Sequence, residues 1–400
     1  MIYKIRAVDQ LFFRSGTPFE AKGETHLLKS QFPPYPGTYS GSFAYFMEGD
    51  KKGRKLKISY NGILCDETFC FPKPLDTAVI DSSTTQSGNA REEKHYKLER
   101  MKLTKKPPSN FPLSYCLARQ TDVAKKDKSS DDIYVNQQSL QQYLNGEASE
   151  LNAFSLSNYF ENERKIGIRT KSKTGKTEEG MLYQIGMVQP GQRLQLAVEL
   201  KDLEIVEHQS ISLGAEGRVA EVTAFAEGLV MPAIESDSEY FKLYFATPAI
   251  FGNGWYPQWI DQETKVGSFL FKKRKVTLEL IAASMGRYEA IGGFDTKKGK
   301  PKEMKYAVPA GSVYYFKILD GDFKTAMKLF NQKCISDCRE NMSGLKFENH
   351  EIDKQQKNGF SKMNFSRDRL VYCDRGFGYA MVGKLNEKEE AQLECLKRKN

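Results

Sequence analysis

Between Leu243 and Phe316 the sequence predicts three glycine-containing turns: Ile250-Phe251-Gly252-Asn253-Gly254-Trp255-Tyr256-Pro257, Met285-Gly286-Arg287-Tyr288 and Ile291-Gly292-Gly293-Phe294-Asp295. Each turn interrupts or ends a segment rich in β-branched and aromatic residues, as strands do when a turn needs a positive φ or a close backbone approach. Such turns expose backbone amides, and cations flank them at Arg287, Lys297, Lys298 and Lys300. The combination suits an anionic polymer, although ordinary β-turns explain the glycines as well.

Length and composition indicate a protein of two or three domains. The 400 residues are 40% hydrophobic and carry a formal net charge of +9, which is only a mild signal for a polyanionic partner. No apolar run approaches the length of a membrane span and no secretory signal is present, so a cytoplasmic protein without membrane contact is expected. Seven scattered cysteines then favour reduced thiols over a disulfide framework.

The N-terminal region combines a strand with a proline corner. Residues Ile2 to Phe13 alternate as a strand, and Phe32-Pro33-Pro34-Tyr35-Pro36-Gly37 cannot be helical. Thr38 or Ser40 then offers an N-cap for a helix from about Ser40 to Met47. Its small first residues, Ser40, Gly41 and Ser42, would leave amides free for a phosphate, or would allow a tightly packed corner.

The next region predicts two hairpins separated by a polar insertion. Residues Lys57 to Phe71 read as strands broken at Asn61-Gly62, and residues 81–150 read as an insertion with short helices. Arg164 to Met187 then reads as two strands joined by a basic tip. Its cations form a phosphate clamp or a merely solvated loop: Lys165, Arg169, Lys171, Lys173 and Lys176. Because Thr170 stands where a P-loop needs its first glycine, Gly175-Lys176-Thr177 does not indicate a nucleotide triphosphatase.

Further strands and two helices complete the pattern. Strands are expected over Gln192–Leu203, Ser212–Val222, Tyr240–Thr247 and Val276–Ser284. An amphipathic helix with a core-facing stripe is expected over Phe323–Cys334, capped by Asp320 or Asp322, and a solvated helix over Glu387–Lys399. This rhythm fits an α+β fold of two ferredoxin-like (RRM-like) domains with a protruding hairpin thumb and glycine-rich loops, the first over residues 1–205 and the second over residues 206–400.

The sequence offers little for catalysis. His26, His95, His208 and His350 stand alone, without the motif of a zinc protease, zinc ribbon or deaminase. The cysteine pairs Cys65/Cys70 and Cys334/Cys338 lack the second pair that a zinc site usually has. The two Gly-x-Gly runs lack the third glycine of a dinucleotide site. We therefore predict no catalytic residue, no metal ligand and no cofactor.

Glycine turns, cations and aromatics together favour single-stranded RNA as the partner. Amides and cations hold phosphates, and aromatic rings stack unpaired bases. The predicted stacking residues are Trp255, Tyr256 and Phe377, each of which could equally be a core residue beside a glycine. The other predicted contacts are Arg14, Arg218, Gly252, Arg287, Gly292, Gly293, Arg375 and Lys384, together with the clamp and helix residues named above.

Seven motifs in order resemble the third subunit of the Cmr, or type III-B, CRISPR effector complex. They are Asp9-Gln10-Leu11-Phe12-Phe13-Arg14-Ser15-Gly16-Thr17-Pro18-Phe19, Pro33-Pro34-Tyr35-Pro36, Gly167-Ile168 to Glu179-Gly180-Met181-Leu182-Tyr183, Leu213-Gly214-Ala215-Glu216-Gly217-Arg218, Thr247-Pro248-Ala249-Ile250-Phe251-Gly252-Asn253-Gly254-Trp255, Ile291-Gly292-Gly293-Phe294-Asp295 and Pro309-Ala310-Gly311-Ser312-Val313-Tyr314-Tyr315-Phe316. The resemblance runs from about Asp9 to Gly383 and skips 81–150 and much of 336–370.

This resemblance implies a non-catalytic RAMP protein in antiviral defence. It would hold the repeat-derived 5′ tag of the guide RNA and dock onto the large polymerase-like subunit, beside the RAMP backbone and small subunits. The hairpin from Lys165 to Lys176 would be the thumb that separates tag from guide. Two departures are notable: Ala215 replaces the second glycine of a Gly-Gly-Glu, which is tolerated unless its φ is positive, and Phe43 and Ala44 stand where relatives often carry an arginine.

Two other functions fit the sequence. His26 lies between the first strand and the first helix, where RAMP endoribonucleases that process guide precursors often keep a histidine, although a surface loop explains it too. If the glycine turns face only neighbouring subunits, the protein would instead be an interaction module without RNA contacts.

Overall fold

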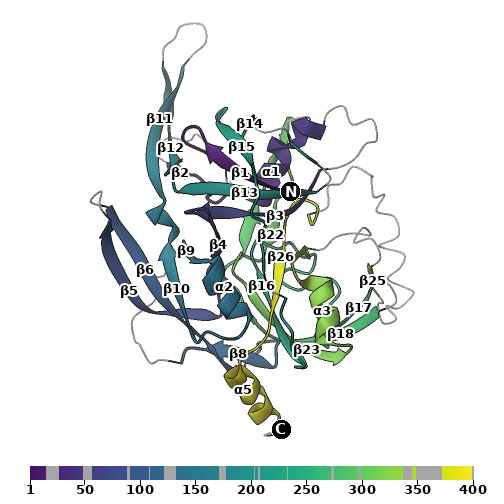
Figure 1. Ribbon diagram of the computed structural model, residues 1–400. Coiled ribbons are helices and arrows are strands. Elements are labelled where there is room, and N and C mark those ends of the chain that lie inside the picture. The colour runs from purple at the N-terminus through teal and green to yellow at the C-terminus, as the bar shows by residue number, and fades with distance from the viewer. Residues whose placement is uncertain are drawn as a thin grey trace.

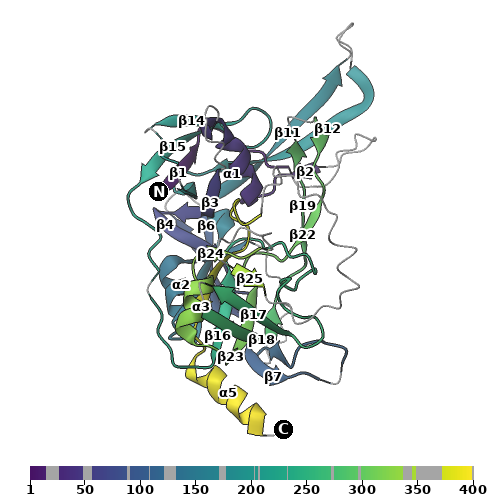
Figure 2. The same ribbon diagram turned by 90° about the vertical axis from the view of Figure 1, so that its right-hand side faces the viewer.

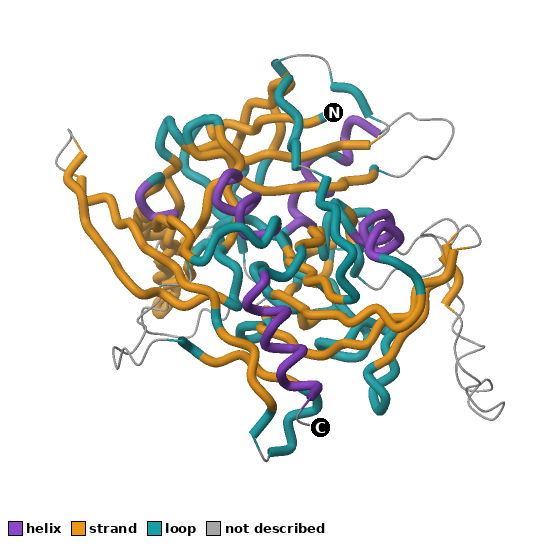
Figure 3. Tube along the Cα trace, turned by 60° about the horizontal axis from the view of Figure 1, so that its bottom comes forward, coloured by secondary structure: helices purple, strands orange, loops and turns teal. Residues whose placement is uncertain are grey.

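The structure is a computed structural model of the chain (Figure 1). It describes residues 1–14, 27–47, 56–87, 91–107, 109–120, 132–170, 177–201, 203–205, 208–231, 233–271, 274–295, 299–336, 345–347 and 372–398. Strands dominate these residues and the helices are short, as the α+β prediction requires (Figure 3). No described helix combines the length and apolar character needed to cross a membrane.

The described strands form a ten-stranded first sheet, a seven-stranded second sheet and smaller units. The first sheet contains β1 (Ile2–Ala7), β3 (Lys57–Cys65), β4 (Thr68–Pro72), β5 (Thr77–Ser87), β6 (Arg91–Arg100), β9 (Ile133–Asn136), β10 (Glu150–Ser155), β13 (Leu194–Lys201), β14 (Gln209–Ser212) and β15 (Val219–Phe225). The second contains β16 (Tyr240–Phe245), β17 (Val266–Phe271), β18 (Arg274–Ser284), β23 (Val313–Asp320), β24 (Lys333–Cys334), β25 (Leu345–Phe347) and β26 (Tyr379–Gly383).

The remaining elements are short, apart from one long hairpin. The small sheets are β11 (Phe160–Thr170) with β12 (Thr177–Pro190) and β2 (Leu27–Lys29), β7 (Lys102–Lys105) with β8 (Tyr115–Ala118), β19 (Glu289–Ile291) with β22 (Lys305–Ala307), and β20 (Phe294–Asp295) with β21 (Lys300–Pro301). The helices are α1 (Pro36–Ser42), α2 (Gln137–Leu144), α3 (Phe323–Phe330) and α5 (Glu387–Arg398), with 3-10 turns η1 (Ala44–Met47) and η2 (Leu156–Asn158).

In the first sheet, β1 lies between two strands that come much later in the chain. It pairs antiparallel with β13 on one side and with β15 on the other, so the local order is β15-β1-β13-β3. Tyr3 and Ile5 of β1 are buried in the core cluster of this sheet. The predicted strand over Ile2–Phe13 is therefore shorter than expected, and Leu11 only forms an isolated bridge with Val188.

The region 81–150 is not the helical insertion that its polar composition predicted. Its described residues contain one helix, α2, and otherwise strands, of which β5 and β6 form a long antiparallel hairpin. Leu98, Val135 and Leu140 are fully buried in the largest core cluster. Alternation of apolar and polar residues hid this role, because each strand has one solvent-facing side.

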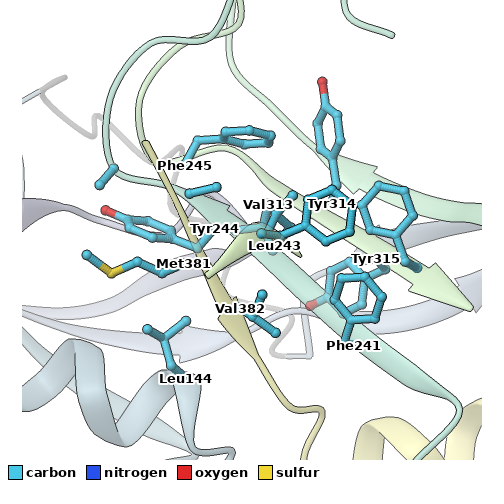
Figure 4. Close-up of a cluster of buried hydrophobic side chains, with 14 of the residues drawn as sticks. Leu144, Phe241, Leu243, Tyr244, Phe245, Val313, Tyr314, Tyr315, Met381 and Val382 are labelled. Carbon is cyan, nitrogen blue, oxygen red and sulfur yellow. The ribbon is translucent and has the colours of Figure 1, made fainter. Parts of the chain in front are cut away.

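The second sheet has the local order β26-β16-β23-β18, with α3 between β23 and β26 in the chain. Figure 4 shows its aromatic core, where Phe241, Tyr244 and Tyr315 crowd against neighbouring strands. Helix α3 is confirmed, with Asp322 as its N-cap and a buried stripe, although it ends at Phe330 rather than at Cys334. Cys334 instead belongs to β24.

The expected break at Asn61-Gly62 is wrong, because β3 runs straight through it and the turn falls at Asp66 and Glu67, both of which have positive φ. Gly62 is required for packing: a Cβ there would overlap the Tyr60 hydroxyl, and Tyr60 is fully buried. Asn61 donates a hydrogen bond to the Gly376 carbonyl. Asn61 thus ties β3 to the loop that precedes β26, and neither residue turns the chain.

Two helix predictions need correction. Helix α1 begins at Pro36, with Tyr35 as its N-cap, because proline fits the first helical position. Ser40, Gly41 and Ser42 therefore occupy its last turn, and their amides are not free for a phosphate. Helix α5 is not simply solvated, since Glu389 and Leu393 are buried.

Four buried charges join both sheets to α5. Arg100 Nη1 lies 3.3 Å from Glu389 Oε2, and Lys242 Nζ lies 3.7 Å from Glu389 Oε1. The Tyr143 and Tyr315 hydroxyls each donate a 2.6 Å hydrogen bond to Asp76, the fourth charge. We call Asp76, Arg100, Lys242 and Glu389 the buried charge cluster.

Most of the cysteines match the expectation of reduced thiols. Cys65, Cys70, Cys116, Cys334 and Cys395 are free. Cys373 is disulfide-bonded, so the expectation is wrong for this residue.

Candidate nucleic-acid interface

A cleft of about 550 Å³ lies between the two sheets. One wall is the proline corner Phe32–Pro36 with Tyr134. The other consists of residues that follow β16 or β18 or precede β23: Thr247, Pro248, Gly286, Arg287, Tyr288, Glu289, Pro309 and Ala310. Segments that are far apart in the sequence thus meet at one place. Proline and aromatic side chains give the cleft an apolar lining with a few polar groups, as is common for ligand sites.

Charged and hydroxyl groups stand among these apolar walls. Arg287 is exposed, and no described residue pairs with it. The Tyr35 hydroxyl is hydrogen-bonded to Glu289; burial first, and then this carboxylate, raise the pKa of Tyr35 well above its usual value. The wall that holds Tyr35 is therefore fixed to the loop that presents Arg287.

The hairpin of β11 and β12 is confirmed as two antiparallel strands, which project beyond the rest of the described chain (Figure 1). Its base is tied down: Leu11 exchanges two backbone hydrogen bonds with Val188, and Lys165 forms a 3.1 Å ion pair with Glu216. The backbone of Arg169 belongs to β11. The tip cations Lys171, Lys173 and Lys176 lie outside the described residues, so their contacts stay a prediction.

The turn beside the hairpin base packs against the first strand segment. Gly214 has a φ of +83°, and a Cβ there would lie 2.5 Å from the Phe12 carbonyl oxygen. Glu216 also has a positive φ, whereas Ala215 does not, so the replacement of glycine by Ala215 is tolerated as expected. Arg218 pairs with Asp9 and is largely covered, which makes it a structural cation in this conformation.

The predicted stacking residues are mostly buried. Phe377 is 1% exposed and packs with Ile250, Ile291 and Ala307. Tyr256 is also buried, and Trp255 lies half-buried against it with ring centroids 3.7 Å apart. We correct the prediction for Phe377 and Tyr256, because neither ring offers a face to a base in this conformation; a position next to glycine did not predict exposure.

The other predicted contacts are spread over the molecule. Arg14 and Gly252 are exposed. Gly293 follows Gly292 directly, and its carbonyl accepts a hydrogen bond from the Lys302 amide. Burial lowers the pKa of Arg375, whose Nε has no hydrogen-bond partner. The Lys384 amide donates to Leu144 at the end of α2, and Lys384 does not line the cleft. Among the predicted contacts that the structure describes, only Arg287 lines the cleft.

The structure adds an exposed aromatic pair that the sequence did not single out. Tyr288 and Tyr306 lie beside the cleft with ring centroids 4.7 Å apart. Part of the signal was local, since Tyr306 directly precedes the buried Ala307 in β22, whereas Tyr288 stands just ahead of β19.

The described part of the chain contains no candidate metal site. No group of three or more His, Cys, Asp or Glu side chains there could hold a metal ion. His95 is exposed near Glu93, His208 has a φ of +57°, and His26 and His350 lie outside the described residues.

Comparison with solved structures finds similar chains in CRISPR complexes. One, from the cryo-EM structure of the type III-B Cmr-beta complex bound to cognate target RNA, is 16% identical, with a TM-score of 0.49 and coverage of 95% of this chain and 96% of that chain. Another, from the complex bound to cognate target RNA and AMPPnP, is 17% identical, with a TM-score of 0.47 and coverage of 79% and 86%. A search among curated proteins gave no match.

The family comparison covers most of the sequence. The model described as CRISPR-associated protein (Cas_Cmr3) matches residues 3–365 of the 400. This range contains the glycine turns, the hairpin and both walls of the cleft. The protein therefore belongs to the Cas_Cmr3 family of CRISPR-associated proteins, and the resemblance to a type III-B Cmr subunit is confirmed.

Proposed function

We propose that this protein is a non-catalytic subunit of a type III-B CRISPR effector complex that binds the guide RNA and holds its repeat-derived 5′ tag. The observation that carries the proposal is the cleft, where motif segments from distant parts of the sequence, at 33–36, 247–248 and 309–310, line one space together with the exposed Arg287. A cation beside an apolar, aromatic wall is suited to a nucleotide, whose phosphate is charged and whose base is flat.

The strand orders support a pair of ferredoxin-like domains as the scaffold. In each sheet the local order, β15-β1-β13-β3 or β26-β16-β23-β18, is the fourth, first, third and second strand of a six-element repeat. The second repeat keeps a helix, α3, between its third and fourth strands. Because this fold hosts many functions, the strand orders support the proposed architecture but do not support the RNA-binding role.

The β11–β12 hairpin is the proposed thumb. Its base is anchored through Leu11 and Lys165, so the two strands leave the first sheet in a defined direction. The large polymerase-like subunit, the RAMP backbone subunits and the small subunits are the proposed neighbours, as the family resemblance implies. Cleavage and signal synthesis would then belong to those subunits.

RNA binding by the purified chain tests the proposal. End-labelled guide RNA with its 5′ tag should bind more tightly than the same RNA without the tag, and both should stay intact. Replacing Lys165, Arg169, Lys171, Lys173 and Lys176 with Ala should weaken binding. The slope of log affinity against log salt concentration should become shallower by about 0.7 for each lost phosphate contact.

Lys324→Ala with Lys328→Ala is the matched control, since both lysines are exposed on α3, away from the hairpin (Figure 2). Equal affinity for tagged and untagged RNA would contradict tag recognition. A metal-independent cut that disappears in His26→Ala would replace the proposal with a guide-processing endoribonuclease.

A further inference from the structure

The β19–β22 ribbon has one covered face and one open face. Ile291 and Ala307 are buried on the covered side, against Ile250 and Phe377. Tyr306 lies opposite Ala290 in the register. Since side chains of a strand alternate between its faces, Tyr306 belongs to the other face. Tyr288 directly precedes β19 and reaches the same face, because its ring contacts that of Tyr306.

That open face carries two large aromatic rings in solvent. Tyr288 is 62% exposed and Tyr306 is 61% exposed. Their rings meet edge to face, with centroids 4.7 Å apart and planes at 74°. In such an arrangement the edge of one ring covers a face of the other, and the contact itself leaves both faces of the first ring uncovered. A flat ligand could stack there without moving the ribbon.

Exposed apolar side chains usually occur singly, but this pair is part of a patch. Met304, also exposed, lies two residues before Tyr306, directly ahead of β22. A patch of this kind marks a binding surface rather than an unfilled core.

The charge around the patch identifies its ligand class. Between residues 287 and 305 the sequence has six Lys or Arg against three Asp or Glu. Arg287 is adjacent to Tyr288 and lines the cleft, and Lys300 is exposed. Rings beside cations that lack a described partner match the alternating base and phosphate of a single strand.

We propose that Tyr288 and Tyr306 form a stacking site for one unpaired base of single-stranded RNA, with Arg287 bound to the adjoining phosphate. This rests on the proposed function and adds to it the surface over which the strand leaves the cleft. Figure 2 shows the β19–β22 ribbon and the β11–β12 hairpin on the same side of the molecule, so one RNA strand could contact both.

The test uses the full chain and tagged guide RNA with 2-aminopurine placed at each tag position in turn. One position should lose fluorescence on binding, as a stacked base does. The double variant Tyr288→Ala, Tyr306→Ala should restore that fluorescence and weaken binding about tenfold to a hundredfold. Its salt dependence should equal that of the wild type, because no charge is removed. Tyr288→Phe with Tyr306→Phe should keep the quenching.

Tyr45→Ala is the matched control, because Tyr45 is 74% exposed on η1, outside the cleft. Failure of the wild type to bind tagged RNA would refute the proposed function itself. Wild-type binding with unchanged affinity and quenching in the double Ala variant would overturn only the stacking site. If the double Ala variant binds RNA as the wild type does but no longer assembles with the purified partner subunits, the patch is a binding site for a protein instead of RNA.

Discussion

Lys242 Nζ lies 3.7 Å from Glu389 Oε1, and both side chains are buried. Lys242 is in the middle of the second sheet and Glu389 is in the first turn of α5. Glu389 also contacts Arg100 from the first sheet. One carboxylate therefore faces two buried cations, and α5 is held to the molecule by charge as well as by Leu393.

Removing this carboxylate should destabilise the whole protein. Glu389→Ala leaves Arg100 and Lys242 buried without it and also removes the hydrogen bond from the Asn386 amide. We expect the free energy of unfolding to fall by about 3–5 kcal/mol, measured by urea denaturation. Glu394→Ala, an exposed change on the same helix, should stay within about 0.5 kcal/mol. Equal effects of the two would contradict the role of the cluster.

Lys242 should make stability depend on pH in alkaline solution. Burial, and then the charge of Arg100, lower its pKa from 10.5 to about 8, while Glu389 and Asp76 oppose this. Between these two values the unfolded chain binds more protons than the folded one, so this residue's contribution to stability rises with pH. The cost of the buried cation is fully present below pH 8.

The comparison with Lys242→Met isolates that contribution from thiols and tyrosines, which titrate in the same range. The unfolding free energy of the wild type minus that of the variant should rise between about pH 8 and 9.5, by at most about 1.4 kcal/mol per unit. A difference that stays flat across this range would mean that Lys242 is not the titrating group.

Gly214 and Gly217 should respond differently to alanine. Both have positive φ, but a Cβ at Gly214 would lie 2.5 Å from the Phe12 carbonyl oxygen. A Cβ at Gly217 would have no described atom within 4 Å. Gly217→Ala should cost only the left-handed strain of about 1–2 kcal/mol. Gly214→Ala should cost clearly more in thermal or urea unfolding. Similar costs would show that the Phe12 segment gives way.

Arg287 and Arg218 should separate binding from stability. Arg287→Ala removes an exposed cation, so the affinity for tagged RNA should fall. The slope of log affinity against log salt concentration should also become shallower by about 0.7. Arg218→Ala removes the partner of Asp9; it should lower the unfolding free energy by about 1 kcal/mol and leave the salt dependence unchanged. Titrations at several salt concentrations measure both effects, and the reverse pattern would exchange the two roles.

The sequence predicted best where periodicity was local and strong. The α3 stripe with its Asp322 cap and the strands β13, β16 and β18 all follow from patterns within a dozen residues. It failed where a distant partner decides the structure. Asn61-Gly62 has the composition of a turn, but Tyr60 covers Gly62 and Asn61 binds Gly376, so the strand continues.

The candidate site was predicted in part. The cations and glycine turns were visible as motifs, and Arg287 does line the cleft. Exposure was not visible, because a ring beside a glycine can face either way. Phe377 turns inward to a small core with Ile250, Ile291 and Ala307, while Tyr288 and Tyr306 turn outward. These directions depend on contacts between segments that are far apart in the sequence.

The position of β1 between β13 and β15 also bears on how the chain matures. On the ribosome β1 emerges first of these strands, yet its second neighbour is complete only at Phe225. At about 5–20 residues per second, roughly 10–40 s pass before β13 is complete at Lys201, and until then both edges of β1 are unpaired. Tyr3 and Ile5 are exposed during that interval, which makes the nascent N-terminal strand a substrate for chaperones that bind apolar segments.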